Sequence, residues 1–259
     1  YKRQVSVLCW IGDSYAQLSE FPSKTVTIVA PFPPGGAIDQ VGRALSQSLY
    51  DIWKQPVVLM NKGGAGGAIG MASVANSLPD GYTLLATHSA IISLPTSEKL
   101  FGRNPPFERS SFTPLALLVA DPVAFIVPAE SSWKTAQDFI LDAKKRPDAI
   151  TYSSSGAYSA LHLPMEMFAN AAGIKLRHVP FAGGGPALTA VLSSVVDVST
   201  GVPAVVTPYI KAGKFRALFV TGSKRHPLLP DVPTAIELGF KDVEFYLWVG
   251  LFGPANMPE

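Results

Sequence analysis

Three strands predicted in this sequence run directly into short loops of small residues, and each loop leads into a predicted helix. The loops are residues 31–38 (PFPPGGAI), 153–158 (SSSGAY) and 180–185 (PFAGGG). In an open α/β sheet, ligands bind beyond the carboxyl ends of the strands, which is where such loops lie. Any one of them also fits an ordinary strand-to-helix turn. Three in one chain predict alternating strands and helices and suggest a shared site.

Apolar patterning supports this alternation along the body of the chain. Short β-branched runs alternate with runs in which apolar residues recur at helical spacing. This order is typical of a mostly parallel sheet flanked by helices. We therefore expect an α/β fold with strands at 25–30, 57–60, 83–87, 115–119, 123–127, 150–153, 176–179, 195–199, 215–220 and 245–252, and helices at 41–52, 136–145, 159–172, 186–193 and 204–212. A further helix is expected to follow the glycine-rich stretch 63–70 and to run through Val74.

Two predicted crossovers divide these elements into two lobes. They lie near Asp121-Pro122 and near Gly222-Ser223. The first lobe is expected to comprise residues 21–121 and 223–259, with the last strand joining its sheet. The second lobe is expected to comprise residues 122–222.

Residues 1–20 differ in character from the rest. Lys2-Arg3 precede an apolar stretch at 5–11 and then Ser14-Tyr15-Ala16, the order found at the end of a secretory signal. We expect either a signal remnant or a disordered N-terminus. The single cysteine, Cys9, lies here, so an internal disulfide and a cysteine-rich metal site are excluded.

Composition and motifs exclude several classes of function. The 21 Lys and Arg against 19 Asp and Glu give a net charge of +2, which is too even for nucleic-acid binding. No apolar run after residue 20 is long enough to span a membrane. The four histidines show no metal-ligand spacing, and there is no nucleophile elbow or P-loop. The stretch 64–69 lacks the third glycine of a dinucleotide fingerprint. We therefore expect no catalytic residue, metal or cofactor.

The loops instead suit an anion. The first turn of a helix offers unpaired N–H groups and the positive end of the helix dipole, so a carboxylate can bind there without an arginine. Asp39 is expected to orient the first loop by accepting backbone N–H groups, because facing an anion it would repel it. The candidate ligand-binding residues are Phe32, Gly35, Gly36, Ala37, Asp39, His88, Ser154, Ser155, Gly156, Tyr158, Ser159, His162, Phe181, Ala182 and Gly183.

Several segments in fixed order resemble a known family. They are residues 21–24, 31–39, 61–67, 79–85, 152–156 with 162–163, 178–181, 210–214 and 229–234. Together they resemble the tripartite tricarboxylate transporter substrate-binding proteins, also called the Bug or TctC-like family. The resemblance runs from about Phe21 to the last residue.

This resemblance implies a monomeric periplasmic binding protein that holds a small carboxylate between two lobes and delivers it to integral membrane permease subunits. It places the carboxylate between the loops at 32–39 and 154–159. It also implies that the first lobe is truncated at its C-terminus. Ala182-Gly183-Gly184 stands where relatives usually carry a Lys or Arg. Two alternatives remain open, namely a carboxylate-sensing module for a membrane kinase and an α/β hydrolase or dehydrogenase. The resemblance allows a di- or tricarboxylate, an amino acid or an aromatic acid as ligand.

Overall fold

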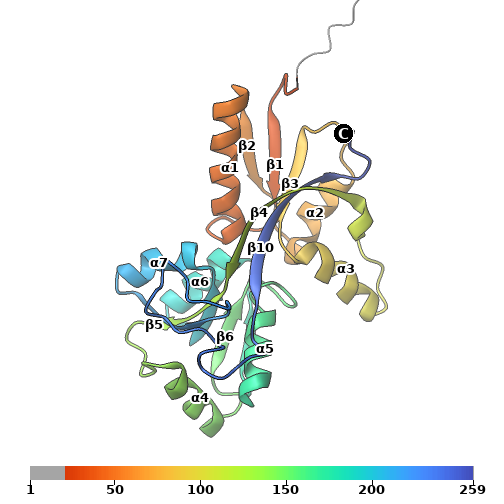
Figure 1. Ribbon diagram of the computed structural model, residues 1–259. Coiled ribbons are helices and arrows are strands. Elements are labelled where there is room, and N and C mark those ends of the chain that lie inside the picture. The colour runs from red at the N-terminus through yellow and green to blue at the C-terminus, as the bar shows by residue number, and fades with distance from the viewer. Residues whose placement is uncertain (1–20, 259) are drawn as a thin grey trace, which may run out of the picture.

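A computed structural model describes residues 21–258, and they form two α/β lobes joined by a pair of long strands (Figure 1). The predicted signal segment and Cys9 lie outside the described residues. Within residues 21–258, no helix combines the length and apolar character needed to cross a bilayer. The predicted two-lobe α/β architecture is confirmed.

The first lobe contains a five-stranded sheet in the order β2-β1-β3-β10-β4. β1, β2 and β3 pair in parallel, whereas β10 runs antiparallel to both β3 and β4. The strands are β1 (Val26–Ala30), β2 (Val57–Asn61), β3 (Thr83–Thr87), β4 (Phe112–Pro122) and β10 (Tyr246–Pro254), and the helices are α1 (Ala37–Trp53), α2 (Ala68–Ala75) and α3 (Ala90–Leu100), with 3₁₀ turns at η1 (Ala65–Gly67) and η2 (Arg109–Ser111).

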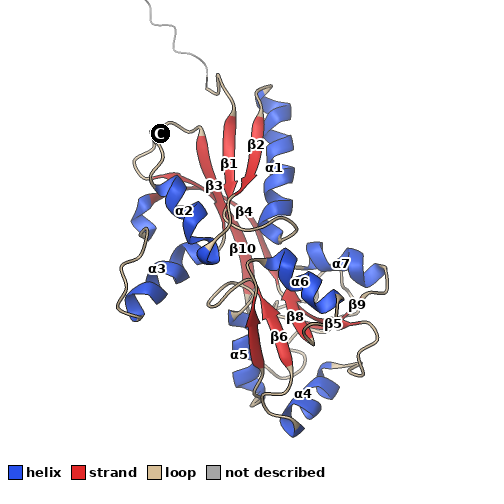
Figure 2. Cartoon of the chain, turned by 180° about the vertical axis from the view of Figure 1, so that it is seen from behind, coloured by secondary structure: helices blue, strands red, loops and turns tan. Residues whose placement is uncertain are grey.

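The second lobe repeats this plan with the strand order β7-β6-β8-β5-β9 (Figure 2). Its parallel strands are β6, β7 and β8, and β5 runs antiparallel to β8 and β9. The elements are β5 (Ala124–Pro128), β6 (Thr151–Ser154), β7 (Arg177–Pro180), β8 (Val198–Gly201), β9 (Phe215–Val220), α4 (Ala136–Lys145), α5 (Leu163–Ala172), α6 (Gly184–Leu192) and α7 (Pro203–Lys211).

Both sheets are therefore mixed, but in each of them four of the five strands run in the same direction and only one, β10 or β5, runs against them, so the expectation of mostly parallel sheets is confirmed. Each sheet has two parallel pairs and two antiparallel pairs. In the first lobe, the antiparallel pairs involve β4 and β10, the strands that carry the chain between the lobes (Figure 1). Because β10 returns from the second lobe toward the first, it runs opposite to β4, which leaves it.

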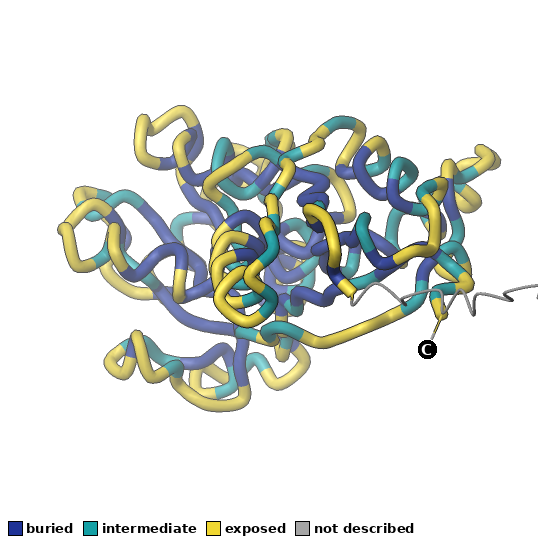
Figure 3. The backbone as a smooth tube through the Cα atoms, turned by 90° about the horizontal axis from the view of Figure 1, so that it is seen from above, coloured by how far each residue is buried: buried dark blue, intermediate teal, exposed yellow. Residues whose placement is uncertain are grey.

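Apolar packing continues from one lobe into the other. Ile28 and Leu85 of the first sheet belong to the same buried cluster as Leu188 and Val206 of the second lobe. Figure 3 shows buried residues along the middle of the molecule and exposed residues on the outer helices and loops. A separate cluster fills the outer half of the second lobe, where the rings of Phe125 and Phe219 stack with centroids 4.1 Å apart. The lobes are therefore closed against each other.

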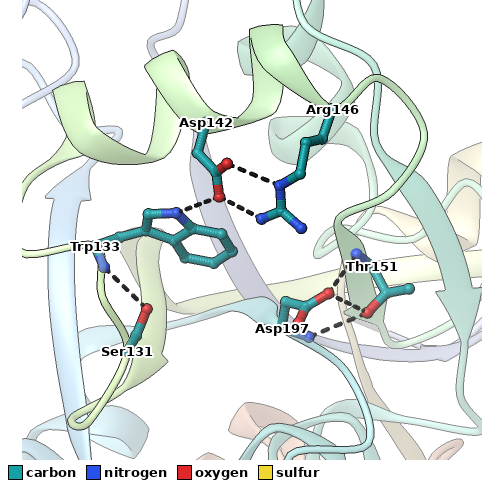
Figure 4. Close-up of polar contacts among 6 residues, drawn as sticks. All are labelled: Ser131, Trp133, Asp142, Arg146, Thr151 and Asp197. Carbon is teal, nitrogen blue, oxygen red and sulfur yellow. Dashed lines mark hydrogen bonds and ion pairs between the residues drawn. The ribbon is translucent and has the colours of Figure 1, made fainter.

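Polar contacts stabilise the end of the second lobe that lies farthest from the first lobe (Figure 4). Asp142 accepts hydrogen bonds from the Trp133 indole N–H at 2.9 Å and from Arg146 Nε at 2.8 Å. The Asp197 carboxylate accepts from the backbone N–H and the hydroxyl of Thr151, both at 2.7 Å. These bonds fix where β6 begins, and so they help to hold the loop at its other end.

The chain returns to the first lobe later than the predicted position near Gly222-Ser223. Residues 223–244 remain on the second lobe, because Ala235 and Val243 are buried in its aromatic cluster and Phe240 packs against Phe168. Only at β10 does the chain join the first sheet.

One predicted helix begins later in the structure, and one helix of the structure was not predicted. The helix expected at 159–172 begins at Leu163, with Pro164 in its first turn, and residues 159–162 form turns. The sequence prediction missed α3, which contains the buried Pro95.

Thr221 joins the two segments that cross between the lobes. It is fully buried, and its hydroxyl accepts the Val123 N–H at 2.9 Å and donates to the Phe245 carbonyl at 2.6 Å. Its backbone N–H donates to Val123 and its carbonyl accepts from Phe245. Val123 follows β4 and Phe245 precedes β10, so one residue ties the outgoing and returning chain together.

We expect Thr221→Val to lower the free energy of unfolding by about 2–3 kcal/mol, because both crossing segments lose a buried partner. Thr207→Val is the matched control, since the buried Thr207 hydroxyl has no hydrogen-bond partner among residues 21–258. Its stability should be unchanged or raised. Urea unfolding measures both. Equal losses in the two variants would show that the Thr221 hydroxyl does not hold the crossing segments.

Candidate functional site

Asp39 shapes the loop between β1 and α1. Its buried carboxylate accepts the Gly35 N–H at 3.1 Å, Arg43 Nε at 3.1 Å and Asn61 Nδ2 at 3.1 Å. Asn61 also donates to the Phe32 carbonyl. Burial alone would raise the pKa of Asp39, but these donors together hold it below its ordinary value. Asp39 is thus an ionised carboxylate that accepts hydrogen bonds from the loop and its neighbours. This is the orienting role expected from the sequence.

His88 closes the first-lobe side of the site. It follows β3, is buried, and its ring stacks on Phe32 with centroids 4.9 Å apart. Burial lowers the pKa of His88 to about 4, so the ring is neutral at physiological pH. Its Nδ1 accepts the Ala90 N–H at 3.1 Å. In a neutral imidazole the proton then sits on Nε2, which makes that atom a donor.

The loop after β6 contributes a buried hydroxyl without a partner. Ser155 is 3% exposed, and its Oγ has no hydrogen-bond partner among residues 21–258. The Ser159 Oγ is also buried without a hydrogen-bond partner among these residues. Ser154 differs, because its Oγ accepts the Gly156 N–H and lies 2.6 Å from His178 Nε2. Ser155 therefore retains a donor and acceptor that the fold does not use.

The loop after β7 brings the start of α6 against the start of α1. Gly183 and Gly36 cap these helices without side-chain hydrogen bonds. A β-carbon placed on Gly36 would lie 3.6 Å from the Gly185 nitrogen and 3.7 Å from the Gly184 nitrogen. The two helix beginnings therefore face each other across the lobe boundary (Figure 2). Each carries partial positive charge, so their approach is electrostatically unfavourable unless an anion lies between them.

A small cavity lies between these helix beginnings. Its volume is about 30 Å³, which is room for one or two water molecules and less than an organic acid needs. None of its lining residues, all within the described range, is a lysine or an arginine. From the first lobe it is lined by Phe32, Pro33, Gly36, Ala37, Ile38, Asp39 and His88, from the second by Ser155, Leu161 and Gly184, and by Leu247 of β10.

The structure thus gathers six of the predicted residues around one cavity, namely Phe32, Gly36, Ala37, Asp39, His88 and Ser155. Sequence reasoning missed Leu161, Gly184 and Leu247. Gly184 had a signal, since it continues the glycine run, but Leu247 lies far along the chain and reaches the cavity only through the return of β10.

The other candidates lie around the cavity rather than on its wall. Gly35 and Phe181 line an open groove of about 540 Å³ on the outer side of the contact between Gly35 and Gly185. Gly183 packs on Pro33, and Ala182 is exposed. Ser154, Gly156 and Ser159 belong to the loop that carries Ser155 and are absent from the cavity lining.

His162 supports this loop from beneath. Its Nδ1 accepts the Tyr158 N–H at 3.1 Å, and its ring lies 4.1 Å from that of His178. Burial lowers the pKa of both histidines, that of His178 to about 4. Tyr158 itself is half exposed, with its ring 6.1 Å from that of Phe101 in the first lobe. His162 and His178 therefore position the loop in their neutral forms.

Known proteins match this chain over most of its length. The family model described as "Tripartite tricarboxylate transporter family receptor" matches residues 41–259. A protein encoded in the tcbD-tcbE intergenic region of Pseudomonas sp. strain P51 is 33% identical over 245 residues, which cover 94% of this chain and 72% of that protein. Protein BugT of Bordetella pertussis is 31% identical over 234 residues, 90% of this chain and 72% of BugT.

Solved structures match the fold equally well. The periplasmic binding protein BugD superposes with a TM-score of 0.85 at 34% identity, covering 92% of this chain and 79% of BugD. MatC of Rhodopseudomonas palustris with bound malate gives 0.83 at 31% identity, with 92% and 80% covered. A further R. palustris protein with adipate gives 0.86 at 28% identity, with 92% and 79% covered. These are substrate-binding proteins, and the alternative of a hydrolase or dehydrogenase is therefore overturned.

The buried neutral state of His88 predicts a pH dependence of stability. Between pH 6.5 and about pH 4 the unfolded chain binds a proton at this position and the folded protein does not, so stability falls as the pH is lowered. The loss from this residue alone reaches about 3 kcal/mol near pH 4. His88→Asn keeps an acceptor near the Ala90 N–H but does not titrate. Urea unfolding at pH 7 and pH 4.5 should show a smaller loss in the variant, and identical losses would contradict the buried neutral state.

Proposed function

Because the chain belongs to the tripartite tricarboxylate transporter receptor family, we propose that it is a periplasmic receptor. It captures a small carboxylate between its lobes and delivers it to integral membrane permease subunits. The protein acts as a monomer in this scheme, with one site formed by both lobes.

The Ser155 hydroxyl is the observation that carries this proposal. A buried hydroxyl without a partner costs free energy, and here it lines a cavity between two helix beginnings. A carboxylate oxygen would accept its hydrogen. It would also accept from the Nε2–H of His88, which lines the same cavity. A carboxylate has about four lone-pair positions and so can use several such donors at once.

Helix dipoles and neutral donors supply the attraction for the negative charge. The starts of α1 and α6 place partial positive charge on both sides of the cavity, and a carboxylate between them turns mutual repulsion into attraction to a common anion. Asp39 does not cancel this, since Arg43 lies 3.0 Å from its Oδ1 and neutralises it. The absence of a cation from the loop at 182–184 is therefore compatible with anion binding.

Binding requires the lobes to part and close again. The cavity of about 30 Å³ does not admit an acid of several carbons, so the ligand enters an open form and the contacts from both lobes form on closure. A ligand that contacts both lobes binds the closed form more tightly and shifts the population toward it. The lobes would rotate about the two crossing segments, which are joined at Thr221, so these segments form the hinge.

The likeness to MatC and to the adipate-bound protein supports dicarboxylates as the first ligands to test. In each complex the acid was identified in a protein of similar fold at about three-tenths sequence identity. We propose dicarboxylates of the size of malate or adipate for this chain as well.

A dicarboxylate panel tests the proposal. A ligand at one hundred times its Kd should stabilise the folded protein by about 2.7 kcal/mol, seen as a saturable rise in Tm. The neutral diamide of each acid is the control, because it keeps the carbon skeleton and loses the charge. No rise with any carboxylate, or equal rises with acid and diamide, would count against a carboxylate receptor.

Ser155→Ala tests the site itself. The variant should bind the active dicarboxylate about 10–100-fold more weakly, the range for a hydrogen bond to a charged group, with stability of the free protein unchanged or raised. Ser46→Ala is the matched control. Ser46 is buried in α1, and its Oγ also has no partner among residues 21–258, but it does not line the cavity. Isothermal titration calorimetry measures the Kd of each variant. If both variants bound like wild type, the proposed location of the site would be wrong.

A further inference from the structure

Closure of the lobes brings two glycine-containing loops into backbone contact. A β-carbon on Gly185 would stand 2.4 Å from the Pro34 carbonyl oxygen and 3.3 Å from Gly35. A β-carbon on Gly183 would stand 2.9 Å from Pro33 Cδ. Neither position has room for a side chain while the lobes are closed. The atoms in the way belong to the other lobe, so the restriction would vanish when the lobes part.

Gly184 lies between these two positions and behaves differently. A β-carbon there would meet Leu161 Cδ1 at 3.4 Å and Gly36 Cα at 3.6 Å, which are ordinary contacts. Neither Gly184 nor Gly185 has a positive φ, so the local backbone does not require glycine at either position. Both lie in the first turn of α6, where alanine would favour the helix. Only the approach of the first lobe explains why Gly185 has no side chain.

The contact at Gly185 also separates two spaces. Gly36 and Gly184 line the inner cavity, whereas Gly35 and Gly185 line the open outer groove. The wall between cavity and groove is therefore the contact of Pro34 and Gly35 with Gly185. This wall keeps water from the carboxylate site, and electrostatic interactions are stronger where water is excluded.

We propose that Gly185 is a positioning residue that seals the closed site. This inference rests on the proposed carboxylate function. The missing side chain lets the beginnings of α1 and α6 approach until both reach one anion, and it closes the outer wall behind the ligand. A methyl group at this position holds the wall open and speeds dissociation of the ligand.

Two variants of the full chain, Gly185→Ala and Gly42→Ala, separate this role from a general effect of adding a methyl group at a crowded glycine. Gly42 is buried in α1, and a β-carbon there would stand 2.6 Å from Leu59 Cδ1 of the same lobe, so it crowds no contact between the lobes. With malate as the probe, or with adipate if that acid gave the larger rise in Tm, Gly185→Ala should raise the dissociation rate constant and Kd about tenfold or more. Gly42→Ala should stay within about threefold of wild type. Urea unfolding without ligand checks that both variants are folded.

Small-angle X-ray scattering without ligand supplies a second readout. Wild type and Gly42→Ala should give the same radius of gyration, and Gly185→Ala a larger one. Equal Kd values and equal radii for the two variants would overturn the inference, as would equal weakening by both. If no carboxylate binds wild type but Gly185→Ala alone is expanded, the proposed ligand class fails and the seal stands. If carboxylates bind wild type and Gly185→Ala alike, the receptor function stands and the seal fails.

Discussion

The structure depends on two helix beginnings that face each other at close range. The partial positive charges of α1 and α6 oppose this approach, so the lobes bring together two groups that favour separation. Glycines at the contact, Gly36, Gly184 and Gly185, make the approach possible, and each loop has its own support. Asp39 and Asn61 hold the loop after β1, and His178 and His162 hold the loop after β6. The strands carry these loops to a common boundary, where the carboxylate of the proposed function would lie between the two positive helix beginnings.

The site handles charge without presenting a cation to the cavity. Asp39 would repel an anion, but Arg43 and Asn61 engage its carboxylate. His88 is neutral because it is buried, and its Nδ1 is engaged by the backbone, which leaves Nε2 as a donor. The remaining contribution comes from Ser155 and the helix beginnings. In the proposed function, such a site would recognise a carboxylate by the number and direction of its hydrogen bonds, while Phe32, Leu161 and Leu247, which also line the cavity, would contact the carbon skeleton.

Local sequence was sufficient to predict the α/β class and the three loops between strands and helices, because strand and helix periodicity and glycine-rich turns are short-range signals. It was not sufficient for features set by distant parts of the chain. The return at Phe245, rather than near Gly222, follows from packing of Ala235 and Val243 on the second lobe. Leu247 reaches the cavity through pairing of β10 with β3 and β4. His162 was placed in a helix at the cleft, yet its ring stacks beneath the loop, since α5 begins only at Leu163.

The hydrogen bonds of Thr221 have a mechanical consequence. Both connections between the lobes meet at this one buried residue, so the outgoing and returning segments cannot slide independently. We therefore expect relative motion of the lobes to be a rotation about an axis near that point. Atoms beside the axis barely move, while the loop tips farthest from it travel along the widest arc. Under the proposed function, a small rotation at this point would let a small acid pass, and most of the hydrogen bonds within each lobe would be undisturbed during loading and release.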